Sequence, residues 1–467
     1  MSVKPDHESW GRVRRVRRRT GSTGEFLASG PGAGFLPFGN GRSYGDSCHN
    51  DRGRIVPMQP GARIRSFDAD TGVLEADAGV LLSEILMRVI PEGYFLEVTP
   101  GTAQVTLGGA IANDVHGKNH HLRGSFGRSV RSFVLLTGDG VPRTCSPMEN
   151  PRLFAATIGG MGLTGFILTA RIQLMRVPSA NIRQMTQRFS HIDGYFDAIE
   201  AIDASHEYSV AWIDQLATGA RTGRGVLMAG DHAEDGGPAR LPRPPRLSVP
   251  FVLPVNVLNG LTLSAFNGLY YGWAPSRPTV SIVPWQGFFH PLDAIGNWNR
   301  LYGPRGLYQH QSVYPEADAR DTTLRLLECA RRHGHASFLT VLKRFGAVVS
   351  PGMMSFPRPG FTLTLDFANL GRRTVAMLDA LDDIVLAAGG ALNPYKDQRM
   401  RPSMFEASFP NWRDLEACRD PNIQSDFWRR TAMLLPDTRG GVAARSELAD
   451  PDQSGTADNL NQMHMPV

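Results

Sequence analysis

Cysteine is scarce in this sequence, and no long apolar run occurs. The four cysteines are separated widely and form no CxxC pair, which is typical of free thiols in a reducing compartment: Cys48, Cys145, Cys329 and Cys418. No segment approaches the roughly 20 consecutive apolar residues that a membrane-spanning helix needs. No apolar stretch or cleavage pattern follows the basic N-terminus, so we expect no signal peptide, no structural disulfide and a cytoplasmic location.

A strong excess of charge is also missing. The 49 basic and 44 acidic residues leave a formal charge of +5, which does not call for nucleic acid as a partner. At 467 residues and 42% hydrophobic composition, the chain exceeds what one hydrophobic core usually serves. We therefore expect a globular protein of two domains.

The common nucleotide-binding motifs are absent, because no GxGxxG opens a helix after a strand and no loop ends in Gly-Lys-Ser/Thr. Three other glycine-rich passages are present, at residues 39–46, 100–110 and 159–165. Glycine lets backbone N–H groups approach an anion such as a pyrophosphate. Taken singly, each passage indicates no more than a turn.

Residues 38–174 read as short strands between glycine turns, which indicates an α+β fold. Asp70-Thr71-Gly72 predicts the turn of a hairpin within residues 63–80. A helix face is predicted by the spacing of four apolar residues, and Pro91 and Gly93 end it: Leu82, Ile85, Leu86 and Val89. Residues 166–174 alternate as in a half-buried strand.

The character of the chain changes after about residue 177, where a second domain is expected. A Pro/Gly-rich passage spans residues 236–254 and contains three arginines, and residues 249–273 are apolar but broken by proline and glycine. This apolar segment either lies on a membrane surface or covers a lipid, or it is a long loop that fills the core; the arginines favour the surface. The tail from residue 447 reads as disordered.

Six arginines lie close together between residues 12 and 19, with Val13 and Val16 between them. A phosphate or lipid headgroup is one partner for such a cluster. A solvated arm or an edge strand is the other interpretation, and the interleaved valines favour it.

Together and in this order, the three glycine passages resemble the FAD-binding domain of the vanillyl-alcohol oxidase and p-cresol methylhydroxylase superfamily. Within it, residues 38–46, 114–121 and 124–127 are similar to the family of oxidases that act on polyprenylphosphoryl ribose. The similarity continues from about residue 8 to about residue 435, through the strings Tyr308-Gln309-His310-Gln311, Val341-Leu342-Lys343-Arg344-Phe345-Gly346 and Lys396-Asp397-Gln398-Arg399.

The resemblance implies a two-domain α+β flavoprotein whose FAD-binding domain is split in sequence. Residues 1–177 would form its first part, and residues 389–446 would complete it. Residues 178–388 would be an inserted substrate-binding domain built on an antiparallel sheet. Residues 447–467 would follow as the disordered tail.

The resemblance also implies which residues hold the flavin. The first pyrophosphate loop would comprise Gly39, Asn40, Gly41, Arg42, Ser43 and Tyr44, and the second would comprise Gly101, Thr102, Gly109, Ala112 and Asn113. The remaining flavin contacts would be His116, Gly117, Ile167, Asn393 and Lys396. Arg42 stands where several members of the superfamily have a histidine bonded to the flavin, so we expect non-covalent FAD.

His116 and Lys396 are the catalytic residues that the resemblance implies. A lysine near the flavin stabilises the negative charge that appears on reduction, and imidazole or a lysine of lowered pKa can accept the hydroxyl proton. The sequence leaves the choice of base open. The substrate pocket would be lined by Lys118, Gln309, Gln311 and Lys343.

The spacing of His116, His120 and His121 also suits a metal site on a helix. Gly117, Asn119 and Gly124 argue against a helix there, so we expect no metal.

The implied activity is oxidation of the 2′-hydroxyl of a polyprenylphosphoryl-β-D-ribose to the 2′-keto sugar, the first half of an epimerisation to the arabinose donor for cell-envelope or glycoconjugate synthesis. An NAD-dependent keto-reductase would be the partner, a quinone a plausible acceptor, and the inner membrane surface a plausible place of peripheral contact. Two alternatives stay open. One is an FAD-dependent alditol or sugar-lactone oxidase, and the other is a non-catalytic protein that binds a membrane surface through residues 12–19 and 240–273.

Overall fold

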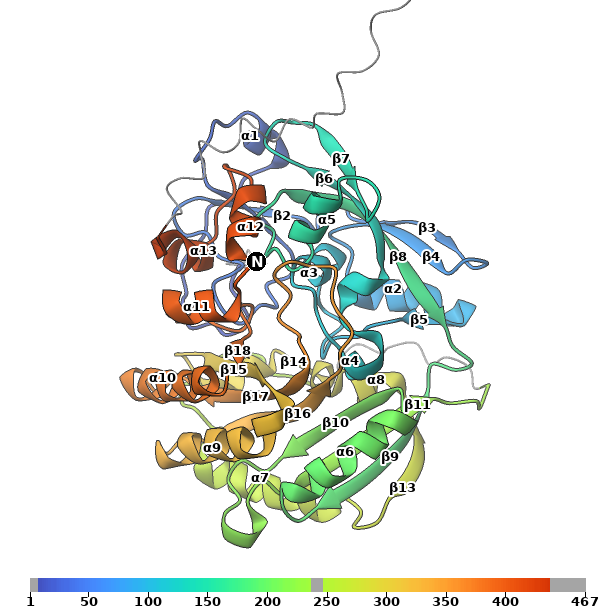
Figure 1. Ribbon diagram of the computed structural model, residues 1–467, viewed down its shortest axis with the longest axis vertical. Helices are drawn as coiled ribbons and strands as arrows, with labels where there is room; N and C mark the ends of the chain where they lie inside the picture. The colour runs from blue at the N-terminus through green and yellow to red at the C-terminus, as the bar shows by residue number, and fades with distance from the viewer. Residues whose placement is uncertain (1–6, 237–246, 437–467) are drawn as a thin grey trace, which may run out of the picture.

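The computed structural model describes residues 7–236 and 247–436, whose strands form two main sheets (Figure 1). The first sheet has six antiparallel strands in the order β3-β4-β8-β6-β7, with β5 paired to β8. Its strands are β3 (Ile64–Asp68), β4 (Val73–Asp77), β5 (Tyr94–Leu96), β6 (Val130–Leu136), β7 (Pro142–Cys145) and β8 (Phe166–Arg176). A parallel pair, β1 (Phe35–Phe38) and β2 (Arg54–Pro57), accompanies it.

Three local predictions for this region are confirmed. The hairpin is β3 and β4, and its turn residue Gly72 has φ 72°. The amphipathic helix is α2 (Leu82–Val89), which buries its four predicted apolar residues and passes through η1 (Ile90–Glu92) to Gly93 at φ 78°. The strand predicted at residues 166–174 lies within β8.

The second sheet has eight antiparallel strands in the order β13-β9-β11-β10-β16-β17-β15-β18. They are β9 (Ile182–Phe189), β10 (Tyr208–Ile213), β11 (Gly225–His232), β13 (Thr279–Val283), β15 (Leu307–Tyr314), β16 (Ser337–Phe345), β17 (Gly360–Ala368) and β18 (Ala391–Leu392). A two-residue parallel pair, β12 (Leu247–Ser248) and β14 (Ile295–Gly296), lies outside this sheet.

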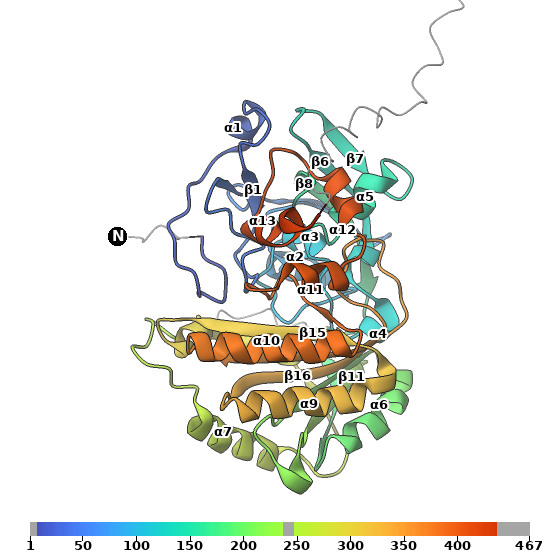
Figure 2. The ribbon, with the colours of Figure 1, turned by 60° about the vertical axis from the view of Figure 1, so that its left-hand side comes forward.

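Helices lie on both faces of the second sheet (Figure 2). One face carries α6 (Asp193–Ser205), α9 (Ala319–Arg332) and α10 (Arg372–Ala387), and His310 of β15 points to Asp382 of α10 at 3.3 Å. The other face carries α7 (Gly260–Trp273), where Tyr270 packs on Trp212 of β10. Because side chains alternate along a strand, Gln309 and Gln311 project to the face opposite His310. That face lines the cavity described below.

Three short C-terminal helices pack against the N-terminal part of the chain: α11 (Pro402–Ser408), α12 (Trp412–Cys418) and α13 (Asp426–Arg430). Arg430 forms an ion pair with Asp46 at 2.8 Å, and the backbone N–H of Asp51 donates to Asp426. Chain segments nearly 400 residues apart in sequence thus share one region (Figure 1). The remaining short helices are α1 (Thr23–Leu27), α3 (Leu107–Ala112), α4 (His120–Arg123), α5 (Pro151–Thr157) and α8 (Trp285–Phe289). The mixed helix and sheet architecture confirms the α+β class.

The basic segment at residues 12–19 forms neither a regular strand nor a wholly solvated arm. The side chain of Arg18 is fully buried and pairs with Asp51 at 2.8 Å, and Arg14 pairs with the same carboxylate. Most of the apolar stretch at residues 249–273 is helix α7 rather than a loop. Within the two described ranges, no helix combines the length and apolarity needed to cross a bilayer. The predicted disordered tail lies outside the described residues.

Candidate active site

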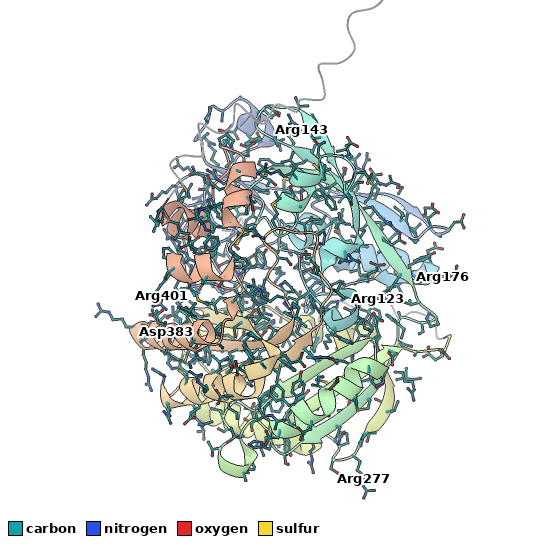
Figure 3. The ribbon with its side chains drawn as sticks, in the orientation of Figure 1. Arg123, Arg143, Arg176, Arg277, Asp383 and Arg401 are labelled. Atoms are coloured by element: carbon teal, nitrogen blue, oxygen red, sulfur yellow. The ribbon has the colours of Figure 1, made fainter. Side chains whose placement is uncertain are left out.

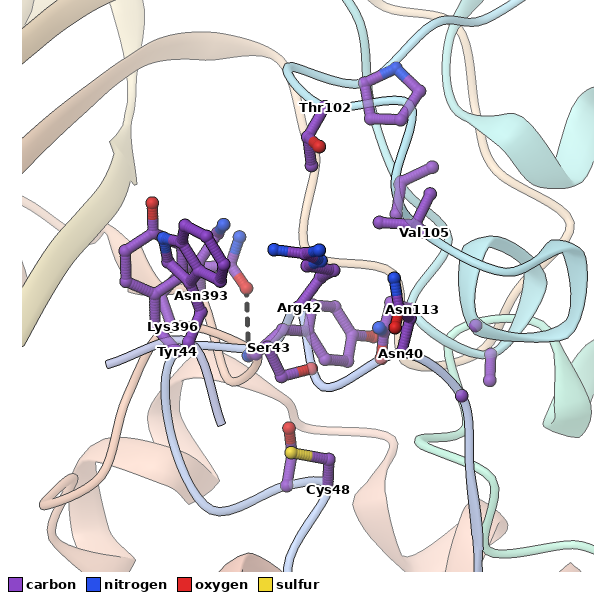
Figure 4. A pocket seen from close by; sticks show the side chains of 18 of the residues that line it. Asn40, Arg42, Ser43, Tyr44, Cys48, Thr102, Val105, Asn113, Asn393 and Lys396 are labelled. Carbon is purple, nitrogen blue, oxygen red and sulfur yellow. Dashed lines mark hydrogen bonds between the residues drawn. The ribbon is translucent and has the colours of Figure 1, made fainter. Parts of the chain in front are cut away.

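A cavity of about 320 Å³ lies between the glycine-rich loops of the first sheet and the open face of the second. The loops contribute residues 39–44, 100–102, 105–106 and 108–109, and strands β15, β16 and β17 contribute Gln309, Lys343 and Thr364. Figure 4 shows Lys396, Asn393 and Tyr44 on one side of this cavity and Asn40 and Asn113 on the other. The volume and the mixed polar and apolar lining suit a cofactor or ligand site.

The first loop requires glycine at two positions. Gly41 has φ 59°, and a Cβ there would lie 2.3 Å from the carbonyl oxygen of Glu8. A Cβ at Gly39 would lie 2.5 Å from Oγ1 of Thr106. The loop is also fixed by Asn40, whose Nδ2 donates to the carbonyl oxygen of Gln104 at 2.7 Å. Its backbone therefore lines the cavity directly, without intervening side chains.

Arg42 supplies positive charge at the centre of the cavity wall. Its guanidinium lies 4.4 Å from the ring centre of Trp10, and burial lowers its pKa. Its buried Nε has no hydrogen-bond partner within the described part of the chain. A buried donor without a partner is costly, so this group suits an anionic ligand such as a diphosphate.

The second loop is held closed by Asp293 from η4 (Pro291–Ala294), far away in sequence. Asp293 accepts hydrogen bonds from Thr102 Oγ1 at 2.8 Å and from the backbone N–H of Ala103 at 2.9 Å. Thr106 caps α3 by accepting from the N–H of Gly109 at 3.1 Å. Gly101 faces open space, so its backbone is accessible from the cavity.

The third glycine passage completes the wall through Met161, Gly162 and Gly165, and Ile167 of β8 lies beside it. Its backbone is tied to the second loop, because the N–H of Met161 donates to the carbonyl of Ala112 at 2.8 Å. Three glycine-rich loops around one cavity, with the side chain of Arg42 in its wall, fit the diphosphate of a dinucleotide.

His116 joins the two halves of the site. Gln311 Nε2 lies 3.0 Å from His116 Nε2, and Lys343 Nζ lies 3.2 Å from His116 Nδ1. Burial and the charges of Lys343, His120 and Lys396 hold the pKa of His116 well below its usual range. The imidazole is therefore neutral at physiological pH and carries a single N–H.

The contacts of His116 with Gln311 and Lys343 determine which ring nitrogen of His116 carries its proton. A Gln311 amide that donates to Nε2 leaves the His116 proton on Nδ1, which then faces Lys343. That arrangement holds for Lys343 as a neutral amine, whereas a Lys343 ammonium would donate to an unprotonated Nδ1. Burial and the charges of Lys118 and Lys396 lower the pKa of Lys343 to about 7, so the amine is accessible near neutrality. The protonation state of Lys343 and the tautomer of His116 are therefore linked.

Lys396 is the second buried lysine of the cavity. Its ammonium lies 4.2 Å from the ring centre of Tyr44, and no hydrogen bond to it is formed by the residues in the described ranges. Burial lowers its pKa to about 8, and the charge of Asp366 opposes that shift. A cation that is only partly solvated and lacks a hydrogen-bond acceptor is available to ligand and substrate.

Asp366 of β17 is completely buried behind Lys396. It accepts a hydrogen bond from Gln309 Nε2 at 2.5 Å, and its other oxygen has no partner within the described residues. Burial raises the pKa of Asp366 to about 7. Asn393, which directly follows β18, donates from Nδ2 to Gln311 Oε1 at 2.8 Å. The amides that face the cavity are therefore held in fixed orientations.

Most residues predicted for the site line this cavity, with two exceptions. Gly117 is not part of its wall, although its carbonyl accepts from Lys343 at 3.3 Å. Lys118 points away, donates to the carbonyl of Phe288 and lies 4.3 Å from that ring. The role of Lys118 in substrate binding stays a prediction, and its present contacts are structural.

The three histidines near residue 120 diverge. Contrary to the glycine-based argument, a short helix, α4, does begin at His120. His120 stacks near Phe345 with ring centres 4.4 Å apart, and His121 lies 3.0 Å from the carbonyl of His206. Within residues 7–236 and 247–436, no group of histidine, cysteine and acidic side chains is arranged to hold a metal ion.

Sequence reasoning missed three acidic residues of the site. Asp293 and Asp366 stand in no motif, since their roles depend on contacts with distant strands and loops. Asp114 lies in the matched string at residues 114–121 and was passed over. It accepts from Ser125 Oγ and from the N–H of Gly127, both at 2.7 Å, and thereby shapes the turn that carries His116.

The rarity of lysine is a signal in the sequence that could have pointed to the site without the resemblance. The chain has only four lysines against 45 arginines, and three of the four lie in or beside this cavity: Lys118, Lys343 and Lys396. Arginine stays charged under all ordinary conditions, whereas a buried lysine titrates near neutrality. A sequence that uses arginine almost everywhere retains lysine where a titratable amine is useful.

Comparison with known proteins agrees with the geometry. Residues 27–146 match the FAD binding domain family model. Decaprenylphosphoryl-β-D-ribose oxidase of Mycolicibacterium smegmatis is 36% identical over 426 residues, which is 86% of this chain and 90% of the relative. An uncharacterized protein in the mprA 5′ region of Streptomyces coelicolor is 34% identical over 76% of this chain and 100% of the relative. L-gulonolactone oxidase of Bos taurus is 29% identical over 32% of this chain and 33% of the relative.

The cavity, its glycine loops and the matched domain define an FAD-dependent oxidoreductase of the vanillyl-alcohol oxidase type. The extent of the first similarity is decisive for the family, since it includes both sheets. The chain belongs to the decaprenylphosphoryl-β-D-ribose oxidase family.

Proposed function

We propose that this protein oxidises the 2′-hydroxyl of a polyprenylphosphoryl-β-D-ribose to the 2′-keto sugar. The observation that carries the proposal is the single cavity in which the dinucleotide loops of the first sheet meet Lys343, Lys396 and the two glutamine amides of the second. Similarity to a decaprenylphosphoryl-ribose oxidase across both sheets supports the substrate class.

FAD, when bound, supplies the two-electron acceptor for the alcohol carbon. The protein supplies the remaining functions. Gln309 and Gln311, with their amides fixed by Asp366 and Asn393, orient the sugar hydroxyls. Lys343 as an ammonium pairs with the phosphate, and the positive charge of Lys396 stabilises negative charge that develops beside it.

The hydroxyl proton needs an acceptor, and the geometry favours Lys396. Both ring nitrogens of His116 are already engaged, by Gln311 and by Lys343. Lys396 has no such partner and a pKa of about 8, so an appreciable fraction is free amine at neutral pH. We assign His116 the role of holding Lys343 and Gln311 in place.

Anaerobic mixing with substrate tests the function. We expect a prenylphosphoryl-β-D-ribose to bleach the visible absorbance of the bound flavin, while free ribitol and L-gulonolactone leave it unchanged. The 2′-deoxy analogue is the matched control, because it keeps the phosphate and lacks the reacting hydroxyl. Bleaching by the free sugars alone would assign the chain to the alditol and lactone oxidases.

We also propose the finer features of this activity. FAD is held non-covalently, with Arg42 in the first loop. An NAD-dependent keto-reductase consumes the 2′-keto product, and a quinone reoxidises the flavin. The enzyme works in peripheral contact with a membrane. The domain division at residues 1–177, 178–388 and 389–446 is supported by the two sheets and by the packing of α11 to α13 on the N-terminal segment.

A further inference from the structure

An extended apolar surface lies beside the second sheet, outside the candidate active site. We call it the apolar face and define it by the exposed side chains of α7 and of the segment that leads into it: Phe251, Val255, Leu261, Leu269 and Trp273. Leu261 and Trp273 are each 83% exposed. Large apolar side chains that are exposed together along one segment mark an interaction surface in a stable protein.

Helix α7 exposes large apolar side chains and buries a polar one, which is the reverse of the usual pattern of a surface helix. Leu261, Ala265, Leu269 and Trp273 recur every four residues along its exposed side. Asn267, in contrast, is buried and donates to Asp214 Oδ1 at 2.8 Å. A water-exposed helix normally turns charged residues outward. This helix has no charged residue, which suits an apolar environment outside the protein.

The scarcity of charge extends well beyond the helix. Residues 247–292 contain a single charged side chain, Arg277, although charged residues make up 20% of the chain. Arg277 extends outward at the edge of the molecule (Figure 3). Arg188 lies 5.2 Å from the ring centre of Tyr271 near the end of α7. An apolar surface with cations at its rim complements an anionic lipid surface.

Aromatic contacts connect the apolar face to the cavity. Phe266 of α7 packs against Phe338 of β16 with ring centres 5.7 Å apart, and Phe338 lies 6.3 Å from Trp298. Trp298 lines the cavity, as does Leu339, the residue after Phe338. Helix α7 and the cavity also share one face of the second sheet. A continuous apolar path thus runs from the cavity to the outer surface.

We propose that the apolar face docks on an anionic lipid bilayer, inserts Leu261, Leu269 and Trp273 at the headgroup level, and receives the prenyl chain of a membrane-held substrate along α7. The identity of that substrate rests on the function proposed above. The docking surface itself rests on exposure, charge and continuity with the cavity.

Vesicle binding by the FAD-loaded protein tests this surface. We expect co-flotation with vesicles of phosphatidylglycerol and phosphatidylcholine, weaker binding to phosphatidylcholine alone, and a blue shift of tryptophan emission that Trp273→Phe abolishes. The double variant Leu261→Asp/Leu269→Asp should reduce binding by about tenfold or more, because it places charge where apolar area is buried. Met148→Asp is the matched control, since Met148 is 91% exposed in the loop between β7 and α5, outside the apolar face, and the variant should bind as the wild type does.

Three results would overturn the proposal: no binding of the wild type, equal binding of the double variant with its flavin spectrum intact, or a wild-type dimer that the double variant dissociates in the absence of any vesicle binding. The last result would assign the face to a second copy of the chain. Flavin bleaching by a soluble short-chain prenylphosphoryl ribose separates this proposal from the function. Vesicle binding without bleaching would refute the function alone, and bleaching without vesicle binding would refute the docking surface alone.

Discussion

Lys343 Nζ lies 3.2 Å from His116 Nδ1, so two basic groups share one short contact in a buried site. Both cannot be charged there, and the ammonium of Lys343 lowers the tendency of His116 to hold a second proton. The pKa of His116 lies well below its usual range, and that of Lys343 lies at about 7. Lys343 is therefore the member of the pair whose charge changes near neutrality.

This titration predicts how substrate binding depends on pH. Burial lowers the pKa of Lys343, so its ammonium dominates below pH 7 and is lost as the pH rises through about 7. The affinity for the non-reacting 2′-deoxy phosphoryl analogue, measured by perturbation of the flavin spectrum, should fall over this interval. Lys343→Arg should remove the dependence, because a guanidinium stays charged. An unchanged pH dependence in Lys343→Arg would exclude Lys343 as the phosphate ligand.

Replacing Lys396 separates charge from proton transfer. Lys396→Ala should retain FAD and lower the rate of flavin reduction by roughly 10²–10⁴-fold, the usual range for a general base. Lys396→Arg should be almost as slow, because arginine keeps the charge and cannot accept the proton. Stopped-flow anaerobic reduction measures both. Fast reduction in Lys396→Arg would show that only the charge is needed, and undiminished reduction in Lys396→Ala would remove the residue from the mechanism.

Asp366 should set the pH at which Lys396 works. The carboxylate raises the pKa of Lys396 against the effect of burial, so Asp366→Asn should lower that pKa. If the free amine of Lys396 is the base, the rise of the reduction rate with pH then shifts to lower pH. A pH–rate profile of flavin reduction measures the shift, and flavin affinity serves as the control for misfolding. A lower rate with an unshifted profile would limit Asp366 to a structural role through Gln309.

A substitution at a glycine of the flavin loops should weaken FAD binding without unfolding the protein. Gly101→Ala adds a methyl group in open space that faces the cavity, so the protein should fold but bind FAD about tenfold more weakly, in line with the usual cost of overpacking. Gly30→Ala is the control, because a Cβ at Gly30 also meets nothing within 4 Å and Gly30 lies outside the cavity wall. Fluorescence titration of the apoprotein with FAD compares the two, and equal affinities would place the diphosphate elsewhere.

Acid precipitation checks how the flavin is attached. Arg42 cannot form the covalent link that a histidine forms in several members of the superfamily, so the yellow colour should move entirely into the supernatant. Flavin that stays with the pellet would point to another residue of the cavity, for which Cys48 is the first candidate because it lies in the wall.

The sequence predicted local structure where one periodicity dominates. Helix α2 and strand β8 follow from spacing alone, and the turn at Gly72 follows from residue chemistry. The glycine loops were recognised only through their order, because each is an ordinary turn when taken singly. The α4 helix was missed since its four residues depend on tertiary contacts rather than on propensity.

Contacts between distant segments account for what the sequence did not reveal. Asp366 acts on Lys396 across β15, and Asp293 reaches Thr102 over 191 positions. No local pattern encodes either relationship. The sequence shows that α7 lies in an uncharged stretch, but a core helix would look the same. Only the packing shows that the asparagine of this helix is buried and that its leucines are exposed.

The clamp formed by Asp293 has a consequence for the order of assembly. The phosphate-facing loop acquires its closed shape only when a carboxylate from a much later part of the chain arrives, and long-range closure of this kind is a late step in folding. The ribosome must release the segment around residue 293 before the binding site for the coenzyme is complete. Capture of the yellow cofactor therefore reports that both sheets have come together, which makes colour a direct readout of correct maturation.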